Sequence, residues 1–187
     1  LFPHKGWQVS FLGLTGQKNI SYAPNDTLFS QIPPSTRQWQ LATEVASYWH
    51  VSKNTSLMYR GKGMKIWNDY LFINELERLG GLQTMRGFNE RSFFVSAFWL
   101  NTLSYRLHLE QQNTEESMLF IFVDQAWTEK TLWRATPLTQ RLWAIGAGLQ
   151  IQTNVGIFQF VYALGKIARQ PFALNQAKIH FGLMSRF

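Results

Sequence analysis

The sequence contains no cysteine and only 11 acidic residues, against 18 lysines and arginines. Without cysteine the chain has neither a disulfide scaffold nor thiolate ligands for a metal ion. Long apolar runs are missing too: no stretch approaches the roughly 18 apolar residues of a membrane-spanning helix, which excludes a helical membrane protein. The first residues show no basic segment followed by an apolar one, so no signal peptide is visible.

Catalytic and nucleic-acid-binding patterns are missing as well. His4, His50, His108 and His180 lie far apart without metal-ligand spacing, and no serine, histidine and acidic residues form a nucleophile motif. The net charge of +7 comes from scattered basic residues, several at alternate positions of predicted strands, rather than from a basic cluster. We therefore expect no enzyme activity, no metal or other cofactor and no nucleic-acid partner, and we expect His108 and His180 to line a polar interior.

What the sequence does have is aromatic side chains, 16% of the total, within stretches where apolar and polar residues alternate. A period of two indicates β-strands with two different faces, and transmembrane barrels are built from such strands. Eight strands are predicted, at about residues 6–16, 38–50, 55–65, 102–110, 118–124, 143–152, 158–164 and 178–187. The sequence thus predicts an all-β, antiparallel fold.

The connections between these strands alternate in length. In chain order they are long, short, long, short, long, short and intermediate, with residues 66–99 and 128–140 among the long ones. Outer-membrane barrels have long external loops and short periplasmic turns. This order predicts that residues 66–99 lie on the outside and that Phe187 lies at the periplasmic end.

The longest connection, residues 66–99, carries a glycine-rich run that reads Gly80-Gly81-Leu82-Gln83-Thr84-Met85-Arg86-Gly87-Phe88. Its glycines allow sharp turns and close packing of the backbone. A helical turn is expected at residues 74–78 and a short extended piece at residues 93–95. A connection of this length inside a compact domain is usually functional.

One carboxylate falls on the predicted strand 118–124. Asp124 shares a face with Phe122, where a charge is costly unless it is paired. A positively charged partner is therefore expected, and the resemblance described next assigns this role to Arg86 of the long connection. The alternative is that Asp124 lies at a solvated strand end.

These two stretches resemble motifs of the BamA-like outer-membrane superfamily, which includes the barrel-assembly factor BamA, its TamA-type relatives and the two-partner-secretion transporters. Arg86, Gly87 and Phe88 are similar to the family's Arg-Gly-Phe/Tyr loop motif. The run Phe122-Val123-Asp124-Gln125-Ala126 is similar to its Phe-x-Asp-x-Gly strand motif, with Ala126 in place of the glycine. The resemblance implies a loop folded into a barrel lumen, with its arginine against the aspartate of the wall.

The last predicted strand carries a further resemblance. Its alternating residues end on a terminal aromatic, similar to the C-terminal signal by which outer-membrane barrels are recognised for insertion; the residues concerned are Phe181, Gly182, Leu183 and Phe187. The alternative is the edge strand of a soluble sandwich. Soluble proteins avoid exposed aromatics at an unprotected sheet edge, which favours the barrel.

Eight strands alone would make a barrel just wide enough for its own side chains, with no room for a loop of about thirty residues. We therefore predict that residues 1–187 are the C-terminal part of an outer-membrane barrel, namely the last eight of about sixteen strands, as the resemblance also implies. The N-terminal barrel half and periplasmic modules are expected outside this chain.

The resemblance implies a location in the outer membrane of Gram-negative bacteria and a role in assembling outer-membrane proteins through a lateral seam between the first and last strands. The expected partners are outer-membrane lipids, unfolded outer-membrane protein clients, and periplasmic or lipoprotein accessory subunits. Two alternatives stay open: a two-partner-type secretion pore, and a barrel that anchors an N-terminal enzyme domain such as a lipase.

Overall fold

The computed structural model describes residues 5–21, 31–109, 117–153 and 155–185. Its elements are β1 Gly6–Asn19, β2 Ser35–Ser52, β3 Thr55–Trp67, η2 Ile73–Glu75, β4 Glu77–Leu79, β5 Phe93–Val95, β6 Ala97–Leu109, β7 Ser117–Lys130, β8 Leu138–Gln152, β9 Gly156–Ile167, η3 Leu174–Gln176 and β10 Lys178–Ser185. Among these residues, helical structure is limited to short 3-10 turns, and no helix is long and apolar enough to cross a membrane.

Eight of the strands form one sheet in the order β1-β2-β3-β6-β7-β8-β9-β10. Every neighbouring pair is antiparallel, and the chain adds strands one after another along the sheet. The predicted all-β, antiparallel arrangement is confirmed. The sheet is not closed: β1 and β10 each have one edge without a neighbouring strand among the described residues.

The predicted alternation of faces is clearest in the middle of the sheet. On β7, Met118, Phe120 and Phe122 are buried, whereas Leu119 and Ile121, between them, are exposed. Because successive residues of a strand point to opposite faces, one face of the sheet is mostly apolar and points outward, while the other carries the buried positions.

Several strands extend beyond the predicted bounds. β6 begins at Ala97, whereas the prediction placed its start near residue 102. The prediction missed the first residues because both faces of the strand are apolar there, so that the alternation that marks a strand is lost. β7 continues to Lys130, and β8 begins at Leu138. The predicted long loop at residues 128–140 is therefore wrong: the connection spans residues 131–137 only.

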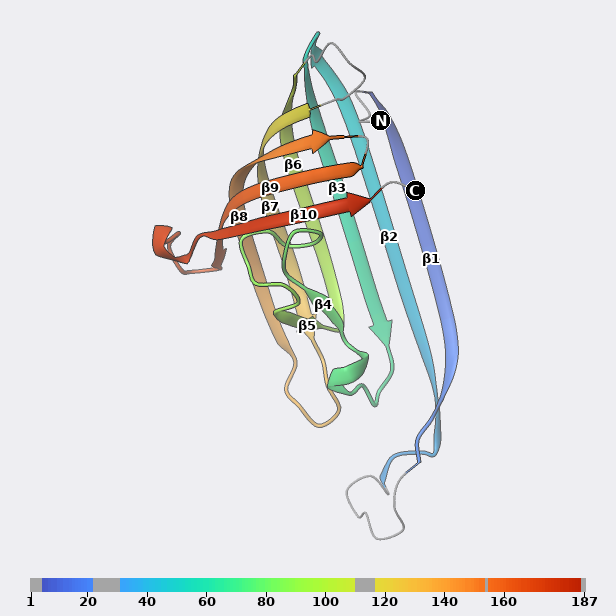
Figure 1. Cartoon of the computed structure of the whole chain (residues 1–187). Helices are drawn as coiled ribbons and strands as arrows, with labels where there is room; N and C mark the ends of the chain where they lie inside the picture. Colours follow the sequence, from blue (N-terminus) through green and yellow to red (C-terminus); the bar gives the residue numbers. More distant parts are fainter. Residues whose placement is uncertain (1–4, 22–30, 110–116, 154, 186–187) are drawn as a thin grey trace.

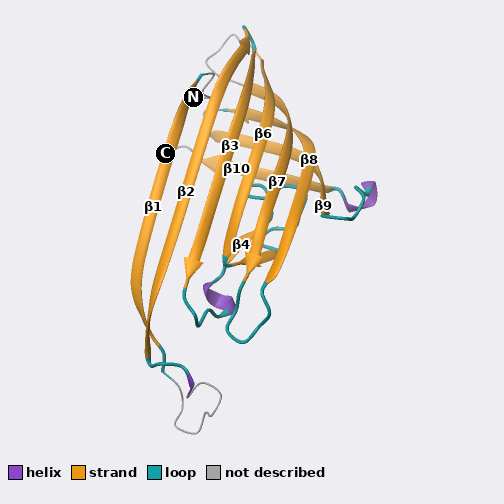
Figure 2. Ribbon diagram, turned by 180° about the vertical axis from the view of Figure 1, so that it is seen from behind, coloured by secondary structure: helices purple, strands orange, loops and turns teal. Residues whose placement is uncertain are grey.

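The sheet curves strongly, and the long connection between β3 and β6 lies on its concave side (Figure 1, Figure 2). Residues 93–95 form the expected extended piece, β5, which pairs with β4 in a separate two-stranded sheet. The helical turn expected at residues 74–78 is only partly present. A 3-10 turn covers residues 73–75, and the chain then becomes extended as β4.

Two clusters of buried apolar side chains fill the space between this loop and the concave face. The larger one contains loop residues and strand residues together, and its members include Met64, Ile66, Leu71, Leu79, Met85, Val95, Phe98, Leu100, Leu142 and Ala144. The smaller one joins Met118, Phe120, Phe122, Val161 and Ala163, with Leu82 of the loop packed against it. The loop therefore supplies much of the core that the curved sheet alone lacks.

Candidate functional site

Arg86 and Asp124 form a buried ion pair between the loop and the inner face of β7. Arg86 Nε donates to Asp124 Oδ2 at 2.8 Å, and Nη2 donates to Oδ1 at 2.6 Å. Arg86 is 6% exposed and Asp124 is fully buried. Two parallel, charge-assisted hydrogen bonds fix the guanidinium in orientation as well as in position.

Two neighbouring side chains contact the pair. Thr102, the register partner of Asp124 on β6, donates its hydroxyl to Oδ1 at 2.8 Å. The Arg86 guanidinium carbon lies 3.4 Å from the ring centroid of Phe122, which allows a cation–π contact. Ala126, at the position where the strand motif has glycine, is buried in the larger core cluster.

The glycine pair sets the path that brings Arg86 inward. Gly80 and Gly81 have φ values of +119° and +94°, a region that side-chain-bearing residues rarely adopt. The turn closes through the Gly81 N–H, which donates to the Met85 carbonyl at 3.0 Å, and through Thr84, whose hydroxyl accepts from the Gly80 N–H at 2.9 Å.

The loop packs against β9 through Gly87 and Phe88. Gly87 has φ of +81°, and a Cβ built there would lie 2.7 Å from the Gly165 nitrogen. A Cβ on Gly165 would meet the Gly87 carbonyl oxygen at 2.5 Å. Phe88 stacks edge-on against Phe93 at 5.1 Å between ring centroids. Loop and strand backbones thus touch directly, and only two glycines facing each other permit this.

The same loop reaches the last strand. The Gly87 N–H donates to His180 Nε2 on β10 at 3.2 Å, and the Leu82 side chain occupies the space that a Cβ on Gly182 would fill. His180 is 8% exposed, and its Nδ1 lies 4.0 Å from Glu90 Oε1. The loop therefore bridges the wall from β7 to β10.

The residues singled out from the sequence divide into two groups. The loop motif, the strand motif and Gly182 come together on the concave face. Phe181 and Leu183 instead point outward, where Phe181 stacks against Phe160 at 4.9 Å between ring centroids. Phe187 lies outside the described residues.

Sequence reasoning missed Thr102 and Gly165 of this site, and it missed the contact that His180 makes. Gly165 carried no signal, since a glycine within a strand has many explanations. His180 was expected only to line the interior, and its contact with Gly87 depends on how the loop folds. Within the described part of the chain, no group of three histidine, aspartate or glutamate residues could hold a metal ion.

An antiparallel sheet with an apolar outer face, and with a loop held on its inner face by a buried ion pair, is consistent with the β-barrel class of outer-membrane proteins. Within that class, the chain belongs to the Omp85 superfamily: the family model of the Omp85 superfamily domain matches residues 1–187. This confirms the resemblance to BamA-like proteins. Comparison with curated proteins and with solved structures gives no significant match.

Proposed function

We propose that this chain is the C-terminal half of an outer-membrane barrel of about sixteen strands that inserts client proteins through a lateral seam at β10. Membership of the Omp85 superfamily supports a role in insertion or secretion at the outer membrane in general. The finer assignment rests on one observation: the loop between β3 and β6 contacts both β7 and β10 on the inner face of the sheet.

The last strand has the features of one side of a seam. Its outer edge has no neighbouring strand among the described residues. Its free edge can accept an incoming strand through main-chain hydrogen bonds.

The loop supports this strand from the inside. Arg86 and Asp124 fasten the loop to β7, while Gly87 and Leu82 carry it to His180 and Gly182 of β10. This bracing would keep β10 in place when its outer edge is unpaired. The expected partners are unfolded outer-membrane proteins at that edge and lipids on the apolar outer face, with periplasmic or lipoprotein subunits as further candidates.

A secretion pore would require the loop to leave the lumen. That movement would break the Arg86–Asp124 ion pair and expose to water the apolar clusters that the loop forms with the strands. The observed contacts favour a loop that stays in place, and hence insertion over secretion.

A reversible disulfide across the seam, between β10 and the first barrel strand, tests the proposal. The chain has no cysteine, so Leu183→Cys can be combined with a cysteine in the first barrel strand of the full-length protein. The protein is reconstituted in liposomes with a urea-unfolded barrel client, and folded client is measured by its heat-sensitive mobility in gels. We expect the oxidised lock to stop client folding and a reductant to restore it.

The matched control places the same Leu183→Cys opposite Phe158→Cys. These two positions are register partners on β10 and β9, so the lock lies inside the sheet and leaves the seam free. Client folding should then be unaffected. Full activity with the seam locked would overturn the seam mechanism, and translocation of a polypeptide in that state would assign the protein to secretion.

A further inference from the structure

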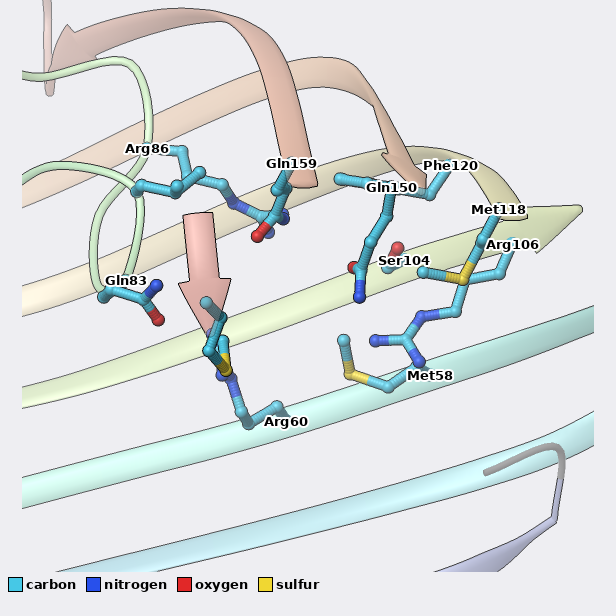
Figure 3. A pocket seen from close by; sticks show the side chains of 12 residues that line it. Met58, Arg60, Gln83, Arg86, Ser104, Arg106, Met118, Phe120, Gln150 and Gln159 are labelled. Atoms are coloured by element: carbon cyan, nitrogen blue, oxygen red, sulfur yellow. The ribbon is translucent and has the colours of Figure 1, made fainter. Parts of the chain in front are cut away.

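A cavity lies between the loop and the end of the sheet at which the short connections β2–β3 and β8–β9 lie. It is on the side of the ion pair that faces away from the larger core cluster. Its volume is about 190 Å³, and six strands contribute to its wall together with the loop. The polar lining consists of Arg60, Gln83, Arg86, Ser104, Arg106, Gln150 and Gln159. Figure 3 shows the three arginines approaching it from β3, β6 and the loop.

Three arginine side chains and no carboxylate line the cavity among the described residues. Only Arg86 is neutralised, since both oxygens of Asp124 are occupied by Arg86 and Thr102. Among the described residues, neither Arg60 nor Arg106 forms an ion pair. Arg106 forms a side-chain hydrogen bond with Tyr48, whose ring centroid lies 5.3 Å from the guanidinium carbon, and this neutral partner leaves the charge of Arg106 in place.

Several buried donors in this lining also lack an acceptor. The Nε atoms of Arg60 and Arg106 and the hydroxyl of Ser104 are inaccessible to solvent and make no hydrogen bond within the described residues. A buried polar atom without a partner costs about 1–3 kcal/mol of desolvation, and a charged group costs more. The Arg60 and Arg106 side chains are themselves partly exposed and line the same cavity from neighbouring strands, so that one negatively charged acceptor there would pair with both.

We propose that this cavity binds a small oxyanion of the phosphate class. Such an ion offers several acceptor oxygens, which guanidinium N–H groups bind with matching geometry. At about 30 Å³ per water molecule, the cavity holds one such ion with a few waters. It is too small for an acyl chain or a folded segment. The bound anion neutralises Arg60 and Arg106 and thereby stabilises the wall beneath the loop.

Calorimetric titration of the full-length protein in detergent with sodium phosphate tests this site. Chloride keeps the ionic strength constant, so that general screening does not contribute. We expect saturable binding that becomes at least tenfold weaker in the double variant R60Q/R106Q. The control is K62Q, which removes a lumenal charge of β3 outside the lining and should bind as the wild type does.

A second measurement needs no variant. Phosphate should raise the urea midpoint of the wild-type protein above that in chloride of equal ionic strength, because a ligand of the folded state stabilises it. A third arm replaces phosphate by glycerol phosphate. Tighter binding of glycerol phosphate assigns the site to a lipid headgroup, and tighter binding of phosphate assigns it to the free ion.

The proposal fails if the wild type shows neither saturable binding nor a shift of the urea midpoint. It also fails if R60Q/R106Q binds phosphate as tightly as K62Q does. These outcomes are independent of the seam, because the site is built from side chains of this chain and the titration requires no client.

Discussion

Strands β1 and β7 are both 14 residues long, yet of the two only β7 has a buried face. On β7, alternate residues from Met118 to Thr128 are buried, whereas β1 is exposed along nearly its whole length. The exception on β1 is Lys18, which reaches Glu75 of the loop at 2.6 Å. The loop therefore packs along the inner face of β7, whereas on β1 only Lys18 reaches it.

The largest effect is expected at the ion pair that holds the loop on β7. Arg86→Ala leaves Asp124 buried without a partner and should lower the free energy of unfolding by about 3–5 kcal/mol. Asp124→Ala should add little on top of Arg86→Ala. Urea unfolding of the full-length protein, followed by tryptophan fluorescence, measures both. Full additivity of the two substitutions would contradict the pairing.

The control for this prediction lies on β1. Lys18→Ala removes a partly buried ion pair at the rim, together with a hydrogen bond to the Tyr70 carbonyl. The loss should be smaller than at Arg86, because this pair is more accessible and Glu75 keeps the hydrogen bond from the Phe72 N–H. A loss at Lys18 as large as that at Arg86 would remove the distinction between the two strands.

An intermediate effect is expected where loop and strand backbones touch. Gly165→Ala places a Cβ against the Gly87 carbonyl oxygen and should destabilise the protein by about 1–3 kcal/mol through overpacking. Gly16→Ala on β1 is the matched control, since nothing lies within 4 Å of its Cβ. Thermal unfolding of both variants decides the point. Equal stabilities of the two would show that the loop does not press on β9.

The smallest of the three effects is expected at the contact between the loop and β10. His180→Leu removes the acceptor of the Gly87 N–H, and a buried donor without a partner costs about 1–3 kcal/mol, part of which the loop recovers by shifting. Amide hydrogen exchange at residues 86–88 should accelerate. His180→Gln offers an oxygen acceptor and should exchange more slowly than His180→Leu; identical rates in both variants would argue against the hydrogen bond.

The strands were predictable where their two faces meet different environments. From Leu103 onward, β6 alternates, and the sequence identifies it. Between Ala97 and Asn101 the pattern fails, because Phe98 and Leu100 are buried beneath the loop while Trp99 points outward and is also apolar. Strand ends covered by a loop thus lose the signal on which prediction depends.

The sequence by itself determined the all-β class, the two faces of the strands where apolar and polar residues alternate, and the identity of Asp124 as a charge in need of a partner. Alternation and charge are local properties of the chain. Only the tertiary structure decided that Gly165 must lack a side chain, that His180 accepts from the loop, and that Arg60 and Arg106 share a cavity. Each of these contacts joins segments that are distant in sequence. The curvature of the sheet and the packing of the loop bring the segments together, and neither leaves a pattern in the local sequence.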